Sequence, residues 1–280
     1  MKKTAILIAA LMSAAPVVAA PPQGVATEAT KAANAEVAAN LPIADQQDFE
    51  NANRGFLARI EEDQILNADK TGWIVIDPLT TPAPAKAGLA LANKTLGDRP
   101  VVAVIFTHSH GDHFGGVAGV ASPEDIQSGK IEIIAPHGWL AGTALPVGRT
   151  GHVGGGLGQK LSSGDVALVP PTRSISKNGE TLTVDGISFD FMDAGETEAP
   201  AELVFYLPQF KALHTAEVVT RTFHNVLTPR GALVRDTLKS SKVIDDMLAR
   251  YGAKSDLMLA SHHWPTWGSD NVQAALKNQR

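Results

Sequence analysis

Four potential metal ligands lie within six residues of this chain, directly after an apolar run. The run spans 101–106 and is too short for an independent helix, so it predicts a buried strand. The ligands at its end are His108, His110, Asp112 and His113. In an extended segment His108 and His110 point to the same side, while Gly111 lets the chain turn and present the next two to a neighbouring ion. The spacing therefore favours a pair of metal ions.

The donor atoms are imidazole nitrogens and carboxylate oxygens, and the chain contains no cysteine. Such donors suit Zn²⁺, with Fe or Mn as harder alternatives. Two ions about 3.5 to 4 Å apart can generate hydroxide from water at neutral pH and stabilise a leaving oxygen. The sequence therefore predicts an enzyme, a metal-dependent hydrolase without thiolate ligands.

The first twenty residues have the order of an export signal: two lysines, an apolar stretch and small residues before Pro21. We expect cleavage after Ala20 and a periplasmic or secreted protein. A linker or short helix is expected over 21–44, and the catalytic domain over 45–280. The apolar stretch is too short and too interrupted for a membrane span.

The rest of the chain predicts strands over 73–76 and 257–260, hairpins over 182–192 and 203–214, and helices over 85–94 and 231–251. Gly252 is expected to end the last helix in the left-handed region. Because no clean βαβ repeat is present, we expect a four-layer αββα sandwich of the α/β (α+β) class. Ligands at strand ends would then converge on one edge of the sandwich.

The run from Thr107 to Gly116 resembles the metal-binding loop of the metallo-β-lactamase superfamily. Further segments closely resemble its alkylsulfatase branch, the type III sulfatases that hydrolyse alkyl sulfates such as dodecyl sulfate. These segments are 197–202, Glu217, 222–236 and 261–268. The resemblance implies the superfamily's αββα fold and a dinuclear zinc enzyme that uses activated water to release alcohol and sulfate.

Two glutamates stand where members of the superfamily commonly have His and Asp. Glu198 occupies the first of these positions, ten residues before Pro208, and Glu217 the second. Glu196 and Glu202 lie close enough to compete with Glu198, and we interpret both as solvated carboxylates. β-Lactamases, lactonases and glyoxalase-type thioesterases generally keep the His and Asp, so these classes are disfavoured.

By the resemblance, the chain binds two zinc ions. One would be held by His108, His110 and Glu198, the other by Asp112, His113 and His263, with Glu217 bridging the two. His263 is preferred to His262 because 263–268 parallels the superfamily's terminal His-Gly-Pro turn. His262 would then orient a neighbouring ligand.

The resemblance also implies residues that act on the substrate. Asp112, Glu217 and Arg230 are the predicted catalytic residues, and His224, Asn225, Thr228 and Arg230 the predicted contacts of the sulfate group. A guanidinium group matches the oxygen geometry of a tetrahedral anion. Arg235 competes with Arg230 for this role. Trp264 and Trp267 either line the entrance for the alkyl chain or pack in the core.

Two alternatives to alkyl sulfate hydrolysis remain from the sequence. In the first, the chain is a catalytically weak metal-binding remnant that binds anionic amphiphiles. In the second, it is a hydrolase of another ester or a lactone. By the resemblance, a small anionic amphiphile is the expected partner. A net charge of −5 without a basic run disfavours nucleic acid. Family members continue after the segment matching 271–280 into a helical dimerisation domain and often a lipid-carrier-like domain. We therefore do not expect dimerisation by that route.

Overall fold

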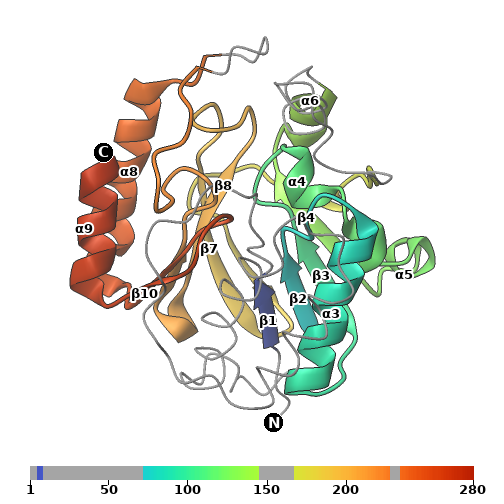
Figure 1. The fold of residues 1–280 in the computed structure, drawn as a ribbon. Helices are drawn as coiled ribbons and strands as arrows, with labels where there is room; N and C mark the ends of the chain where they lie inside the picture. The colour runs from blue at the N-terminus through green and yellow to red at the C-terminus, as the bar shows by residue number, and fades with distance from the viewer. Residues whose placement is uncertain (1–4, 9–71, 145–166, 228–233) are drawn as a thin grey trace.

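The computed structural model describes residues 5–8, 72–144, 167–227 and 234–280. Two sheets lie face to face, with helices on both outer sides (Figure 1). The first sheet is parallel and has the order β1-β2-β3-β4-β5: Ala5–Ile8, Trp73–Ile76, Val101–Ile105, Glu132–Pro136 and Arg173–Ile175.

The second sheet has the order β11-β10-β9-β8-β7-β6: Thr266–Trp267, Leu257–Leu259, Ala212–His214, Leu203–Leu207, Ile187–Asp193 and Thr181–Val184. In this sheet β9 and β10 pair in parallel, and the other neighbours are antiparallel. The expected hairpins are therefore confirmed as β6–β7 and β8–β9, the second with the 3₁₀ turn η2 (Pro208–Phe210).

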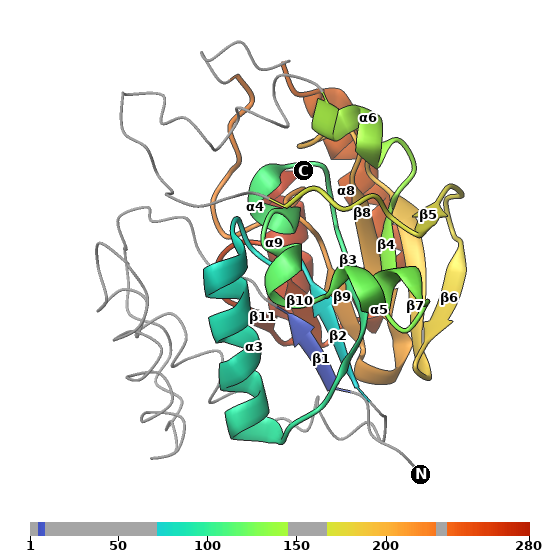
Figure 2. The ribbon, with the colours of Figure 1, turned by 90° about the vertical axis from the view of Figure 1, so that its right-hand side faces the viewer.

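Helices α3 (Pro82–Leu96), α4 (Gly111–Phe114), α5 (Pro123–Gln127) and α6 (Trp139–Ala144) lie on the side of the first sheet, with the 3₁₀ turn η1 (Val117–Gly119). Helices α8 (Thr237–Tyr251) and α9 (Ser269–Gln279) cover the second sheet (Figures 1 and 2). The expected four-layer αββα sandwich is confirmed. No helix among the described residues is both long enough and apolar enough to cross a bilayer.

Strand β2 is apolar throughout and is buried on both of its faces. In β2, Ile74 and Ile76 face the core between the sheets, where they join Phe189 and Phe205. The alternate residues, including Trp73, pack on the helical side. Side chains of a strand alternate between its faces, so a continuous apolar run is what such a strand requires.

Two helix boundaries differ from the sequence-based expectation. Helix α3 already begins at Pro82, because proline fits the first turn, where its missing N–H is not needed. Helix α8 begins at Thr237, since the Asp236 carboxylate accepts a hydrogen bond from the Lys239 N–H at 2.9 Å and caps the first turn. Gly252 is right-handed, with φ −51°, and the chain continues into the 3₁₀ turn η3 (Gly252–Lys254).

Candidate metal centre

The loop after β3 is held by the neighbouring sheet. The Ser109 N–H donates to the Ala201 carbonyl at 3.1 Å, and the Leu203 N–H donates to the Thr107 carbonyl at 2.7 Å. These bonds join the carboxyl end of β3 to the segment that leads into β8. His108 and His110 are consequently buried between the two sheets.

Seven ligand-type side chains form two groups that share Glu217. The ligand atoms within each group lie within 4.8 Å of one another. The first group is His108, His110, Glu198 and Glu217, and the second is Asp112, His113, Glu217 and His262. The expected separation of His108 and His110 from Asp112 and His113 is thus present in the structure.

The two oxygens of Glu217 face different groups. Oε2 lies 3.9 Å from both His108 Nε2 and His110 Nδ1. Oε1 lies 3.4 Å from His113 Nε2 and also contacts His262 Nε2. This arrangement is the one that a carboxylate bridging two ions would need.

Asp77, after β2, orients two of the imidazoles. Its Oδ2 accepts hydrogen bonds from Thr107 Oγ1 at 2.7 Å and from His113 Nδ1 at 3.1 Å. Because the Thr107 hydroxyl gives its proton to Asp77, it accepts the Nδ1–H of His108 at 2.8 Å. Both rings thereby donate through Nδ1, and their Nε2 atoms face the two groups.

The donor set fits a metal. His108 Nε2 is buried without a hydrogen-bond partner in the described chain, and its nearest carboxylate oxygens are 3.8 and 3.9 Å away. Burial and the nearby charge of His113 lower the pKa of His108 well below its usual value, so the ring is neutral and its lone pair is available. A buried acceptor of this kind normally has a partner, and a cation would supply it.

The two histidines of the second group have raised pKa values, unlike His108. Although burial opposes the charged form, Asp112 and Asp77 raise the pKa of His113 well above its usual value. Burial also disfavours charge on His262, yet the Glu217 carboxylate raises the pKa of that ring to about 10. The imidazoles thus serve as counter-charges for the carboxylates, a role that a cation would take over.

Glu198 connects the first group to the substrate segment predicted from the sequence. Its Oε2 lies 3.0 Å from His110 Nδ1, and its Oε1 forms an ion pair with Arg235. Arg235 also donates to the Asn225 carbonyl at 2.6 Å and lies 3.5 Å from His224 Nδ1. The structure therefore brings His224, Asn225 and Arg235 together beside Glu198, whereas Thr228 and Arg230 lie outside the described residues.

The expectation for Glu202 is wrong. Its carboxylate is buried, and it accepts N–H groups of Glu198 and Glu217 at 3.2 and 3.1 Å. Burial and the charges of these two residues raise the pKa of Glu202 to about 8. Glu196 does lie in solvent, where it pairs with Lys239 at 2.8 Å. A short sequence window could not separate the two, because Glu202 also accepts the N–H of Glu217, which lies in the turn after β9.

The choice of His263 over His262 also differs from the structure. His262 Nε2 lies 3.4 Å from Asp112 Oδ2 and contacts Glu217. His263 has φ +67°, and its Nε2 instead lies 3.0 Å from the Thr222 hydroxyl. This left-handed turn directs the His263 ring away from the second group. The resemblance of 263–268 to the superfamily's terminal His-Gly-Pro turn could not reveal that direction.

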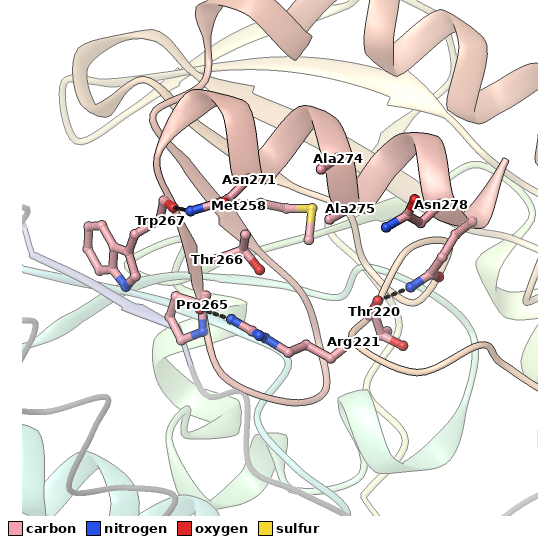
Figure 3. A pocket seen from close by; sticks show the side chains of 11 residues that line it. Thr220, Arg221, Met258, Pro265, Thr266, Trp267, Asn271, Ala274, Ala275 and Asn278 are labelled. Atoms are coloured by element: carbon pink, nitrogen blue, oxygen red, sulfur yellow. Dashed lines mark hydrogen bonds between the residues drawn. The ribbon is translucent and has the colours of Figure 1, made fainter. Parts of the chain in front are cut away.

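The remaining aromatic candidates lie away from the two groups. Trp264 stacks with the Arg221 guanidinium, 5.3 Å from its ring centroid. Trp267 packs on the core between the sheets and lines a cavity of about 590 Å³ beside α9 (Figure 3). Arg221 also lines this cavity and donates to the Pro265 carbonyl at 3.1 Å. No member of the two groups lines it.

The members of the two groups follow the carboxyl ends of β3, β9 and β10 or lie in the connection before β8, and Asp77 follows β2. All of these side chains therefore meet at one edge of the sandwich. The fold and the candidate site together are those of αββα proteins that have a cluster of potential metal ligands at that edge. The chain belongs to the metallo-beta-lactamase superfamily, whose family model matches residues 65–262.

Alkylsulfatases are among its relatives. The chain is 35% identical over 338 residues to a linear primary-alkylsulfatase of Pseudomonas sp, covering 91% of this chain and 50% of the relative. It is 33% identical over 338 residues to an (R)-specific secondary-alkylsulfatase of Pseudomonas sp, with 91% and 51% covered. The solved stereoselective inverting sec-alkylsulfatase from Pseudomonas sp. superimposes with a TM-score of 0.67 at 30% identity, covering 94% of this chain and 54% of that one. The chain thus spans about half the length of these relatives.

Proposed function

We propose that this protein hydrolyses alkyl sulfate esters, of the dodecyl sulfate type, with two zinc ions. The observation that carries the proposal is the placement of Glu217, whose two carboxylate oxygens face two separate groups of ligands. The similarity to primary and secondary alkylsulfatases supports the substrate class.

The ligand set that we propose replaces His263 with His262. His108, His110 and Glu198 would hold one ion, Asp112, His113 and His262 the other, and Glu217 both. When bound, such a pair of ions activates water at neutral pH and stabilises negative charge on a leaving oxygen. Asp77 and Thr107 hold the imidazole protons on the far side of the rings, so that the ligand nitrogens stay available.

Cationic and polar groups beside Glu198 would receive the sulfate group. Arg235 occupies this place in the structure, with His224 and Asn225 next to it. Arg230 and Thr228 belong to the same segment and remain part of the proposal. Guanidinium groups match the oxygens of a tetrahedral anion, and they would hold the ester while water attacks.

The same segment offers apolar surface for an alkyl chain. Phe223 and Leu227 are 61% and 62% exposed, although large apolar side chains are usually buried. They flank His224 and Asn225 in sequence, so an amphiphile with its anionic head at Arg235 would meet apolar side chains directly beyond it. A small-molecule anionic amphiphile is therefore the proposed partner.

Export to the periplasm or medium is proposed from the first twenty residues. Four of them, Ala5–Ile8, form β1 beside β2 in the structure. Amino-terminal sequencing of the protein recovered from cells would test cleavage after Ala20. A mature protein that retains Met1 or starts elsewhere would contradict it.

The test of the function is release of inorganic sulfate from dodecyl sulfate by protein stripped of metal and then reconstituted with Zn²⁺. Zinc-dependent release by the reconstituted protein is the expected result. A folded protein that takes up two zinc ions per chain and releases no sulfate would contradict it. That outcome would favour binding of amphiphiles without turnover, or hydrolysis of another ester or a lactone.

A further inference from the structure

Glu202, at the start of the segment that forms β8, is a buried carboxylate that points toward protein backbone. Its Oε2 accepts the N–H groups of Glu198 and Ala199 at 3.2 and 3.1 Å. Its Oε1 accepts the N–H of Glu217 at 3.1 Å. One side chain therefore touches the main chain of both glutamates in the proposed ligand set.

No Lys, Arg or His of the described chain forms an ion pair with this carboxylate, although its residue is 0% exposed. The Thr197 hydroxyl lies 3.0 Å from Oε2, but also 2.6 Å from the Ala194 carbonyl, and has one proton for both. Burying a carboxylate without a cation is unfavourable. The three N–H groups offset part of that unfavourable energy. Two of them belong to Glu198 and Glu217, which indicates that the side chain holds these two residues in place.

The backbone of Glu202 is fixed independently of its side chain. Its carbonyl accepts the Ala194 N–H at 2.9 Å, and the residue forms an isolated antiparallel bridge with His108. The carboxylate thus extends from a point attached to the β3 loop. It contacts its own β7–β8 connection at Glu198 and the turn after β9 at Glu217.

We propose that Glu202 is a positioning residue that sets the distance and direction between the glutamate ligands Glu198 and Glu217. It would not touch a metal ion or the substrate. The inference rests on the metal centre of the proposed function and is independent of the ester that is hydrolysed.

Glu202→Gln is the informative variant. Three donors surround Oε2 and one surrounds Oε1, so the amide oxygen should take the Oε2 place and leave NH₂ facing the Glu217 N–H. The variant then loses the contact to Glu217 and keeps those to Glu198 and Ala199. Glu196→Gln is the matched control, because it makes the same substitution in the same connection at an exposed side chain, which pairs with Lys239.

Zinc affinity, measured by competition with a chromophoric chelator, should fall by about 10- to 100-fold in Glu202→Gln, the usual effect of losing a group that orients a ligand. The visible absorption spectrum of the Co²⁺-substituted protein should change, since it reports ligand geometry. Glu196→Gln should match the wild type in both measurements. A purely structural role would lower the thermal stability of the metal-free protein without changing the cobalt spectrum.

Glu202→Asp keeps the carboxyl group with both of its oxygens on a shorter side chain, so its zinc affinity should lie between those of wild type and Glu202→Gln. If Glu202→Gln does not fold, the zinc affinity and cobalt spectrum of Glu202→Asp test the proposal instead. A folded variant at position 202 with wild-type zinc affinity and cobalt spectrum overturns the proposal. Because neither readout uses sulfate release, a failure of the proposed substrate would leave this test valid.

Discussion

Oδ2 of Asp77 lies 3.1 Å from Nδ1 of His113, and this contact leaves Nε2 of the same ring facing Asp112 and Glu217. Burial opposes ionisation of Asp77, but the charge of His113 and its hydrogen bond lower the pKa of Asp77 to about 2, so the side chain is an anion at neutral pH. Asp77 therefore acts on the metal centre through the rings that it orients.

Asp77→Asn should weaken zinc binding by about 10- to 100-fold, because the amide cannot replace both oxygens as acceptors. Equilibrium dialysis against buffered Zn²⁺ would measure the change. Asp98→Asn, at an exposed position, is the control and should bind zinc like the wild type. Unchanged affinity in Asp77→Asn would show that the rings keep their orientation without the carboxylate.

His262→Ala and His263→Ala form a matched pair of neighbouring substitutions. His262 contacts Glu217, whereas His263 lies against Thr222, so only the first should lower the zinc content below two ions per chain. Elemental analysis of dialysed protein would give the metal stoichiometry. The reverse result would return His263 to the ligand set.

Arg230 and Arg235 should differ when each is changed to alanine. Arg235 pairs with Glu198, so its loss should lower both zinc affinity and sulfate release. We expect Arg230→Ala to keep its zinc while sulfate release falls sharply, by 100-fold or more if it makes a charge-assisted contact of about 3 kcal/mol. Zinc content and initial rates, measured on the same samples, would compare them. Wild-type rates in Arg230→Ala would remove that residue from the sulfate site.

Gly116→Ala should destabilise the metal-free protein by about 1–3 kcal/mol through overpacking. A Cβ atom at this position would lie 2.0 Å from the Pro78 carbonyl oxygen and 2.7 Å from that of Thr81. Gly252→Ala is the control, because its Cβ would meet nothing closer than 3.5 Å and its backbone is helical. Denaturant unfolding would measure both, and equal stability of the two variants would contradict the packing argument.

His214 should make the metal-free protein less stable in mild acid. Burial lowers its pKa to about 4, from about 6.5 in the unfolded chain. Above pH 6.5 the ring is neutral in both states and contributes no pH dependence. As the pH falls from about 6.5 to 4, only the unfolded chain gains the proton, so the free energy of unfolding decreases by about 3 kcal/mol.

His214→Asn tests this prediction, since the amide oxygen can still accept the Ala216 N–H that Nδ1 accepts at 3.2 Å. Urea unfolding at several pH values should give a flatter pH dependence for the variant than for the wild type. Parallel curves would mean that His214 does not cause the acid sensitivity.

The order of elements and most members of the two candidate ligand groups could be predicted from local sequence, because both depend on short patterns. The apolar run before His108 identifies a strand buried on two faces, and the spacing of His108, His110, Asp112 and His113 fixes which ligands group together. The resemblance supplied Glu198 and Glu217, which the structure brings into these groups.

The errors arose where a role depends on distant backbone. His262 and His263 differ through one left-handed residue, and Glu202 differs from Glu196 in part through the Glu217 N–H, which another strand connection donates. Asp77 was missed altogether. Its signal was an acidic residue directly after a buried strand, but its partners Thr107 and Ser261 are 30 and 184 positions away.

The hydrogen bond from Ser261 Oγ to Asp77 Oδ2, at 2.7 Å, also bears on the order of folding. It joins the ends of β2 and β10, which belong to different sheets, and closes a loop of nearly the whole described chain. Contacts between such distant positions form late, because the chain must first lose the entropy of closing the loop. The proposed metal centre would therefore be completed only when both sheets have assembled, and metal capture would distinguish finished molecules from partly folded ones.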